Sequence, residues 1–358
     1  MNRWTSLSTK HCWEIKRWRK KEKQKRKKLF LQTGSTFLQQ LVADCDGKSN
    51  PIRMFSSAQI LEATDQFDPS CRVSRHGYFT WYRGTIDDRV YALKRFYEDV
   101  RHIEMQVYTD IAISTRVSNH PNFLKLLGCC LEFPLPVLVY EYADNGVLDE
   151  KGGVDGGQLL PWKARVKVAK EIANAVTYLH MAFPRIIVHR DINPMNVFLD
   201  KNWTAKLTGF SCSVSLPEGK SEIEDDDVWG MLGYLDPLQI STGIVTEYTD
   251  VYGFGTFLKV LLTGRPAILR GSRQHIHDYV RDLPEDGELA EIIDQETAQN
   301  MTAAQRSEMA AFRKLALSCC EKRSKDRPKM IEVAKELKQI EKTTIDSTSS
   351  SLSELTHL

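Results

Sequence analysis

The sequence predicts an α+β protein of two lobes, a small β-rich N-terminal lobe and a larger helical C-terminal lobe. Between residues 73 and 143, short runs of alternating polar and apolar residues are typical of strands. From Trp162 onward, apolar residues recur at steps of three and four, which is the spacing of a buried helix face. A chain of 358 residues, 42% of them hydrophobic, is long enough to bury a core of this size.

Residues 1–50 precede this pattern as a basic extension. Residues 1–30 contain twelve Lys and Arg against two Glu, so they carry +10 while the rest of the chain carries −8. Such a run can be a solvated helix or tail, a nuclear import signal, or a segment that binds anionic membrane at about 1 kcal/mol per basic residue. The sequence does not choose among the three.

Other sequence features concern location. No segment reaches the ~18 consecutive apolar residues of a membrane-spanning helix. The N-terminus has no apolar signal-peptide core, and Asn2 stands where myristoylation requires glycine. The eight cysteines lack the C-x-x-C spacing of zinc sites. We therefore expect a cytoplasmic protein with reduced thiols, peripheral at the plasma membrane if the extension binds lipid, and no specific nucleic-acid partner.

The predicted N-lobe is built in chain order. Residues 51–72 are expected to be a lead-in docking segment, in which Ser56 or Ser57 caps a short helix. Residues 73–96 form a predicted hairpin around the turn "TIDDR". A helix is expected over about residues 100–118, and the runs "FLKLLGCCLE" and "PVLVYEYA" after it are strand-like. The lobe, residues 73–143, should thus hold five strands and one helix.

The C-lobe is predicted to span residues 144–342 and to be mostly helical. Its first helix starts at Trp162 and ends at His180. Residues 343–358 are rich in Ser and Thr and are expected to form a flexible tail. The later helices are expected at Asp250–Leu262, Ile276–Arg281, Leu289–Ile293, Ala303–Glu321 and Lys329–Lys342.

Several motifs occur in an order that identifies a fold. "YALK" is followed by "VLVYEYADNGVL", "VHRDINPMNVFLD", "GYLDP", "TDVYGFGTFLKVLLTGRP" and "CCEKRSKDRPKMIEVAKEL". In this order they resemble the protein kinase fold, and specifically the plant receptor-like (Pelle-type) kinases. The resemblance covers about residues 53–341. Such enzymes depend on positioned phosphates, magnesium and a base for the incoming hydroxyl.

The resemblance assigns a role to each residue of the catalytic loop. Asp191 stands at the position of the base, and Asn196, five residues later, at that of a magnesium ligand. Asn193 replaces the lysine of most Ser/Thr kinases, so one cation facing the transferred phosphate is missing. Gly209 replaces the metal-binding aspartate of the next motif, and glycine has no carboxylate to hold magnesium. We therefore expect no productive magnesium site.

The phosphate loop is altered as well. Ser74, His76 and Phe79 stand at its three glycine positions, and the latter two side chains should crowd the γ-phosphate. Lys94, in "YALK", is retained and is the expected contact for weak ATP binding. Its acidic partner is either Asp110 or Glu104. For Lys94, Asp191 and Asn196, we favour retained structural roles over catalysis, because catalytic residues act as a unit.

The segment that follows the metal motif has also changed. Leu238, after Pro237, replaces a glutamate that the family pairs with an arginine, here Arg327. Arg327 should then find another acid or stay partly exposed, and the activation segment loses an anchor. The acidic run "SEIEDDD", Ser221 to Asp227, is expected to be a solvated loop.

The kinase fold is retained while residues of the metal motif, the phosphate loop and the catalytic loop are lost. This combination favours a pseudokinase that acts as a binding module. The chain resembles the pseudokinase branch called the ZRK group, which is similar to the resistance-related kinase RKS. The resemblance implies an adaptor that binds the leucine-rich-repeat part of an NLR immune receptor. It also implies recruitment of another receptor-like cytoplasmic kinase that a bacterial effector has modified. The activation segment, Ser211 to Gly233, is then the expected partner-binding surface and should order on binding.

The alternative is an atypical active Ser/Thr protein kinase in defence signalling. It would use Lys94, Asp191 and Asn196 with one metal ion or none.

Overall fold

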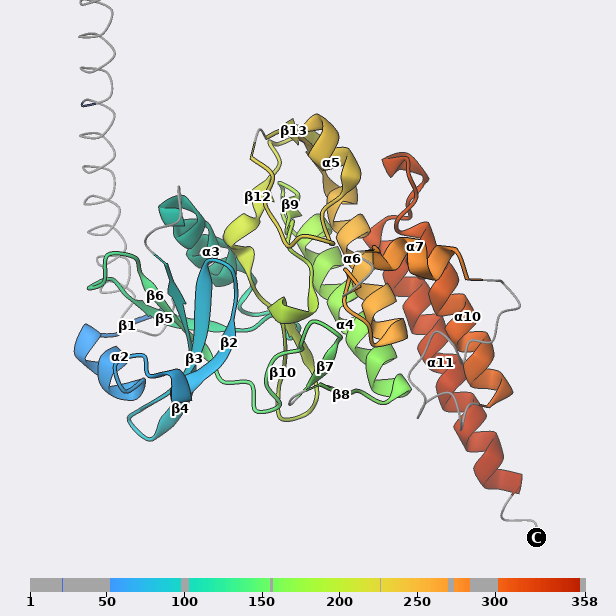
Figure 1. Ribbon diagram of the computed structural model, residues 1–358, viewed down its shortest axis with the longest axis horizontal. Coiled ribbons are helices and arrows are strands. Elements are labelled where there is room, and N and C mark those ends of the chain that lie inside the picture. The colour runs from blue at the N-terminus through green and yellow to red at the C-terminus, as the bar shows by residue number, and fades with distance from the viewer. Residues whose placement is uncertain are drawn as a thin grey trace, which may run out of the picture.

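The computed structural model describes Lys21 and residues 52–97, 103–154, 157–225, 227–269, 274–283 and 302–354. It has two lobes. Figure 1 shows the β-rich N-lobe at the left and the helical C-lobe at the right, with the catalytic-loop elements between them.

A six-stranded sheet forms the N-lobe, in the order β1-β5-β6-β4-β3-β2. Neighbouring strands are antiparallel, except that β1 and β5 are parallel. The predicted hairpin is β3 and β4, and its turn residues Asp87 and Asp88 both have positive φ, as a tight two-residue turn requires. The strands are β1 (Arg53–Met54), β2 (Arg72–Arg75), β3 (Phe79–Ile86), β4 (Arg89–Phe96), β5 (Leu126–Cys130) and β6 (Val137–Glu141).

The lead-in segment contributes the strand that the sequence did not predict. β1 adds to the sheet edge, and helix α2 (Ser57–Ala63) follows it. Ser56, rather than Ser57, caps this helix, because its hydroxyl accepts a hydrogen bond from the Gln59 amide while the Gln59 side chain returns to the Ser56 amide. Phe55 and Ile60 are buried among the side chains of one sheet face. The segment is therefore part of the N-lobe core.

Helix α3 (Ile103–Val117) joins the N-lobe to the altered metal motif. It contacts the short 3-10 helix η3 (Phe210–Cys212), which directly follows Gly209. Its buried face includes Val107, Asp110 and Ser114. Because α3 carries the acidic residue closest to Lys94, this contact brings three distant parts of the chain together.

The C-lobe is organised around α6 (Glu247–Thr263), of which almost every side chain is buried. This helix packs against α4 (Trp162–Met181) and α10 (Ala303–Ser318), and α4 packs against α11 (Met330–Glu354). Figure 1 shows these helices side by side. Among the described residues, the lobe also contains the short helices α5 (Pro237–Thr242) and α7 (Ile276–Arg281).

Short strands and turns position the loops between the lobes. The pairs β10 with β11 and β12 with β9 flank the catalytic loop, and β13 pairs with β14 to join the activation segment to the residues before α6. The strands and 3-10 helices are η1 (Pro69–Cys71), β7 (Gly153–Val154), β8 (Gln158–Leu159), β9 (Ile187–Val188), η2 (Pro194–Asn196), β10 (Val197–Leu199), β11 (Ala205–Leu207), β12 (Val214–Ser215), β13 (Glu222–Glu224), β14 (Ile244–Thr246) and η4 (Ser324–Asp326).

Some element boundaries differ from the predicted ones. α6 begins at Glu247 because the Thr246 hydroxyl caps it, whereas the hydrophobic pattern starts only at Asp250. The backbone of α11 stays helical to Glu354, within the segment predicted as a tail, because Ser and Thr weaken a helix without ending it. The basic extension, except Lys21, and the helix predicted at Leu289–Ile293 lie outside the described residues. No described helix is long and apolar enough to cross a membrane.

Candidate functional site

Lys94 forms a buried ion pair between the sheet and α3. Its Nζ lies 2.6 Å from Oδ2 of Asp110, and neither side chain has any exposed surface. Burial alone would raise the pKa of Asp110, but the Lys94 charge and hydrogen bonds from Ser211 and Tyr140 hold it below its usual value. Of the two acids predicted as partners, Asp110 thus meets Lys94.

Aromatic rings enclose the Lys94 ammonium on its other sides. Nζ lies 3.9 Å from the centre of the Phe79 ring, 4.9 Å from that of Phe96 and 5.6 Å from that of Trp81. These are cation–π distances, and such contacts are strongest where water is excluded. Lys94 is therefore paired with an acid and surrounded by protein groups, with no exposed surface.

The phosphate loop adds to this aromatic cluster. The His76 ring stacks on Phe79 with 4.6 Å between ring centres and 8° between ring planes. Neither nitrogen of His76 has a hydrogen-bond partner among the described residues. Burial, followed by the nearby Lys94 charge, lowers the pKa of His76 to about 4, so the ring is neutral at pH 7. Ser74 lies in β2, opposite Trp81 of β3.

The carboxylate of Asp191 is held by amide groups. Asn193 Nδ2 donates to its Oδ1 at 2.9 Å, and Asn196 Nδ2 donates to its Oδ2 at 2.8 Å. The backbone amide of Met231, from the activation segment, donates to Oδ1 at 2.9 Å. Burial raises the pKa of Asp191 to about 6 although these bonds act in the opposite direction. The group in the base position is therefore buried, and both of its oxygens already accept hydrogen bonds.

Asn196 fills the space beside Gly209. A β-carbon built at Gly209 would lie 2.5 Å from Cγ and Oδ1 of Asn196. The φ angle of Gly209 is +89°, which residues with a side chain rarely adopt. The β10–β11 register pairs Val197 with Leu207 and so brings the two motifs together.

The donor set around Gly209 does not suit magnesium. The ion needs a carboxylate from this motif, which Gly209 cannot supply, and hard oxygen ligands in an octahedral arrangement. Among the described residues, no group of three or more His, Cys, Asp or Glu side chains gathers where it could hold a metal ion. Gly209 therefore leaves this motif without the carboxylate that the fold family uses to hold its metal.

Ser211 has a contact that the sequence did not predict. It occupies the glycine position of the metal motif, and its Oγ donates to Asp110 Oδ2 at 2.8 Å and accepts from Lys94 Nζ at 3.3 Å. The sequence signal for a role of this residue was its polar side chain, because the family has glycine at this position. Through this contact the altered motif stabilises the Lys94–Asp110 pair.

The acidic run of the activation segment is not simply a solvated loop. Arg190 donates from NH1 to Asp225 Oδ2 at 2.6 Å and from NH2 to the Asp227 carbonyl at 2.9 Å. The Arg190 side chain is only 2% exposed. Glu222–Glu224 form β13, which pairs with β14. The expectation was wrong for Asp225, because a buried arginine nearby needs a counter-charge.

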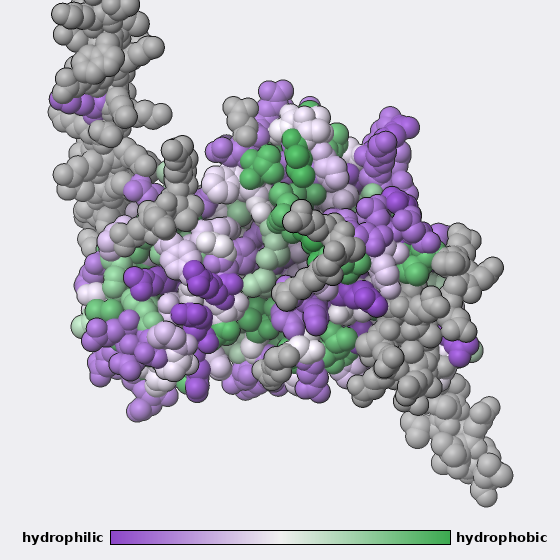
Figure 2. Space-filling model, viewed as in Figure 1, coloured by the Kyte–Doolittle hydropathy of each residue, from purple (hydrophilic) through white to green (hydrophobic). Residues whose placement is uncertain are grey.

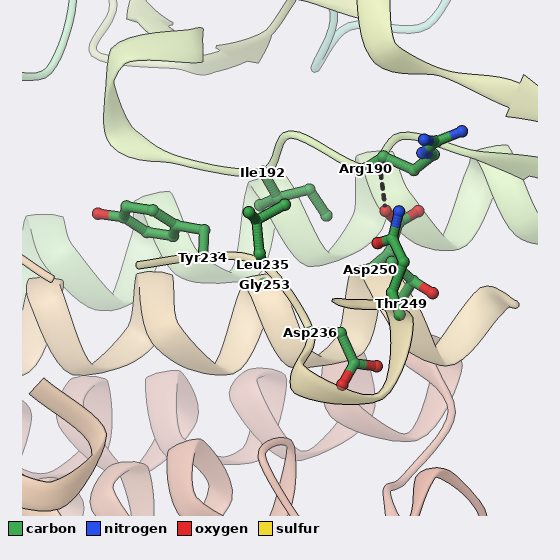
Figure 3. A pocket seen from close by; sticks show the side chains of 9 residues that line it. Arg190, Ile192, Tyr234, Leu235, Asp236, Thr249, Asp250 and Gly253 are labelled. Atoms are coloured by element: carbon green, nitrogen blue, oxygen red, sulfur yellow. Dashed lines mark hydrogen bonds between the residues drawn. The ribbon is translucent and has the colours of Figure 1, made fainter. Parts of the chain in front are cut away.

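The anchor expected to be lost at Leu238 is replaced by Asp236. Arg327 binds both carboxylate oxygens of Asp236, with NH2 donating to Oδ1 at 2.9 Å, and the two side chains are 1% and 3% exposed. Of the two outcomes predicted for Arg327, it thus finds another acid and does not stay partly exposed. Figure 3 shows Asp236 at the turn into α5, beside a narrow crevice lined by Arg190, Ile192, Tyr234, Leu235, Gln239, Thr249, Asp250 and Gly253.

Exposed apolar side chains gather where the activation segment meets α5. Leu232 is 73% exposed, Ile240 53% and Val228 42%. Figure 2 shows apolar surface over α5 and beside it. Larger exposed apolar patches often mark protein-binding sites. An exposed aromatic side chain, Trp203, lies between β10 and β11.

The lobes, the motif order and the retained catalytic loop define a protein kinase domain. A family model described as protein kinase domain matches residues 80–339, and the chain belongs to this family. Similar proteins from Arabidopsis thaliana include the serine/threonine-protein kinase ZRK1, 58% identical, and the non-functional pseudokinases ZRK2, 55%, and ZED1, 46%. The alignments cover 90% of this chain and 95%, 93% and 99% of these relatives. Within the plant receptor-like cytoplasmic kinases, the chain belongs to the ZRK group.

Proposed function

We propose that this chain is a catalytically impaired pseudokinase that acts as an adaptor in plant innate immunity. It links the leucine-rich-repeat side of an NLR immune receptor to a modified receptor-like cytoplasmic kinase, so that a bacterial effector is sensed. The enclosed ammonium of Lys94 carries the proposal. A lysine that is bound by Asp110 and covered by Phe79 and Phe96 has no free side for a phosphate. Two relatives are named as non-functional pseudokinases, which agrees with this assignment.

Nucleotide binding follows from the same geometry. ATP binds weakly at most, because its phosphates would have to displace the His76–Phe79 stack. Magnesium binding is unproductive, because Asn196 occupies the space of the missing carboxylate. The protein then works in the cytoplasm through its surface, and the exposed residues Val228, Leu232 and Ile240 are the proposed contact with the recruited kinase.

The first test measures ATP binding and autophosphorylation of the purified chain with and without magnesium. We expect no magnesium-dependent phosphate transfer and at most weak binding. A Lys94→Met variant serves as the control for binding through the lysine. Transfer that Asp191→Asn abolishes would contradict the proposal, because it would show that the base position is productive.

A second test addresses the partner surface. Leu232→Asp should abolish pull-down of the modified receptor-like cytoplasmic kinase, because a charge would be buried in an apolar contact. Trp203→Asp is the matched control, since Trp203 is also exposed, at 45%, but stands between β10 and β11, outside the activation segment. Deletion of residues 213–227 should also abolish recruitment. If Leu232→Asp and the deletion both left recruitment intact, the activation segment would not be the contact.

The alternative function is an atypical active Ser/Thr kinase in defence signalling. Two observations favour it: Asn196 stays in hydrogen-bond contact with Asp191, and the relative ZRK1 is named as a kinase. This alternative predicts phosphate transfer that Asp191→Asn removes, so the first test separates the two functions.

A further inference from the structure

Lys259 lies inside the C-lobe, far along the chain from the nucleotide cleft. It is on α6, the central helix of the lobe, and its side chain has no exposed surface. Among the described residues, no carboxylate lies within ion-pair distance of its Nζ. Buried lysines normally pair with acids or serve chemistry. None of the roles proposed above uses Lys259.

A cysteine is the side chain that meets this amine. Lys259 Nζ lies 2.8 Å from Sγ of Cys320, which stands two residues after the end of α10. Two carbonyls fix the position of Nζ, that of Ala316 at 2.7 Å and that of Gly255 at 3.2 Å. The Cys320 thiol is directed on its other side to the Tyr252 carbonyl at 3.5 Å. Both reacting atoms are therefore held in contact by the backbones of two helices.

Gly255 explains how the two helices approach so closely. A β-carbon at this position would lie 2.6 Å from Cys320 Sγ and 2.7 Å from Cys319 Cβ. Because Gly255 has no side chain, the end of α10 packs directly against α6. Sγ of Cys320 therefore reaches Nζ of Lys259, which lies one helical turn after Gly255. The contact therefore follows from backbone packing as well as from the two side chains.

We propose that Lys259 and Cys320 form an oxidative modification site, at which hydrogen peroxide joins Nζ to Sγ in a sulfenamide. Peroxide first oxidises the thiol by two electrons, so that the O–O bond breaks, Sγ–H becomes Sγ–OH and water leaves. The amine lone pair then attacks Sγ, the S–OH bond breaks, and the hydroxyl leaves as water with a proton from Nζ. An ammonium would release one further proton to solvent. The product has lost two hydrogen atoms and is about 2 Da lighter.

The crosslink would tie α6 covalently to α10. It would form within the folded C-lobe without a large movement, because the atoms already touch. Thiol reductants would reverse it, as they reverse other sulfur–nitrogen and sulfur–sulfur bonds of cysteine.

The test is peptide mapping of the full-length chain after treatment with hydrogen peroxide. Trypsin cannot cleave after a modified lysine, so the crosslink joins the peptides of residues 221–270 and 315–322. We expect this joined species in the Cys319→Ser variant, in which a bond between adjacent cysteines is excluded. We expect dithiothreitol to remove the joined species. We also expect no joined species from the Lys259→Met and Cys320→Ser variants.

Two results would overturn the proposal. One is oxidation of Cys320 to sulfinic acid in a peptide that stays separate from the Lys259 peptide. The other is the absence of any joined species from the wild-type chain under conditions that oxidise its other cysteines. Because both results come from the unaltered protein, they do not depend on whether a variant folds. Circular dichroism of the Lys259→Met and Cys320→Ser chains checks that their loss of the crosslink is not a loss of fold.

Discussion

At the scale of single residues, the charge of Lys94 is balanced entirely within the N-lobe. Asp110 accepts a hydrogen bond from the Lys94 ammonium, and Ser211 and the aromatic rings complete the surroundings of that group. In an enzyme of this fold, phosphate oxygens share that role. Because the protein already balances the charge of Lys94, this lysine adds little to the affinity for a nucleotide phosphate. Retention of Lys94 therefore does not indicate catalysis.

Restoring the missing carboxylate should fail. Gly209→Asp should lower the free energy of unfolding by about 2–4 kcal/mol, because the new side chain meets Asn196 and the backbone has positive φ. It should not create magnesium-dependent phosphate transfer. Urea denaturation and a phosphate-transfer assay check the two expectations.

Gly219→Asp is the matched control for this change. Gly219 also has positive φ, +73°, but a β-carbon there would meet no atom within 4 Å. This variant should lose only about 1 kcal/mol from backbone strain. Equal losses in the two variants would show that Asn196 does not obstruct the site.

The raised pKa of Asp191 predicts a pH dependence of stability. Burial raises it from 3.8 to about 6, so the folded state binds the proton more tightly than the unfolded state. This contribution to stability is full below about pH 4 and is lost as the pH rises through about 6. The loss is at most about 3 kcal/mol. Comparing the free energies of unfolding of the wild type and Asp191→Asn across this range measures it, and parallel curves would contradict the assignment.

The sequence could predict some residue contacts and not others. Helix register reduced the partners of Lys94 to two acids, and the structure selects the buried one. The contact between Ser211 and Asp110 spans 101 positions, and no local pattern encodes it. The overlap of Asn196 with the space beside Gly209 is likewise a property of the folded hairpin. Local motifs show which catalytic groups are missing, but they do not show which side chains occupy the positions of those groups in the folded protein.

At the scale of elements, the Arg327–Asp236 pair anchors the start of α5. Asp236→Asn should lower the free energy of unfolding by about 3–5 kcal/mol, because it leaves the buried guanidinium without a counter-charge. Asparagine can still cap α5, so the change mainly removes the ion pair. Urea denaturation measures the loss.

The control for this anchor is the pair of Arg323 and Asp326. Their side chains are 65% and 47% exposed, so Asp326→Asn should cost less than about 1 kcal/mol. If Asp236→Asn were equally mild, Arg327 would not depend on this acid, and the segment would lack the anchor described here.

Element types were more predictable than element ends. The period of apolar residues depends on burial, so the long helices and the hairpin could be predicted from it, whereas the six-residue helix α5 was missed. Ends depend on capping groups such as Ser56 and Thr246, and only the structure shows which of two neighbouring hydroxyls accepts the bond. The strand β1 was missed because two residues at a sheet edge leave no periodic pattern.

At the scale of the whole molecule, the charge is divided unevenly along the chain. The first 30 residues carry +10, and the remaining residues carry −8. We propose that this basic segment attracts the protein to anionic membrane. The full chain should then sediment with vesicles of phosphatidylserine and phosphatidylcholine at low salt, and a chain lacking residues 1–30 should not.

Two comparisons control this prediction. Vesicles of phosphatidylcholine alone should bind neither chain, because they offer no anionic charge. Raising the salt concentration should release the full chain, since screening weakens attraction between exposed charges. Binding of the shortened chain to anionic vesicles would mean that another surface carries the attraction.

The enclosure of Lys94 has a practical consequence for finding this protein in cells. Surveys that enrich kinases on immobilised inhibitors, or that tag the cleft lysine with acyl-phosphate probes, depend on an open nucleotide cleft. With its lysine surrounded by Phe79, Phe96 and Trp81, we expect such reagents to capture this chain poorly even where it is abundant. Antibodies or an appended tag would be needed to count it.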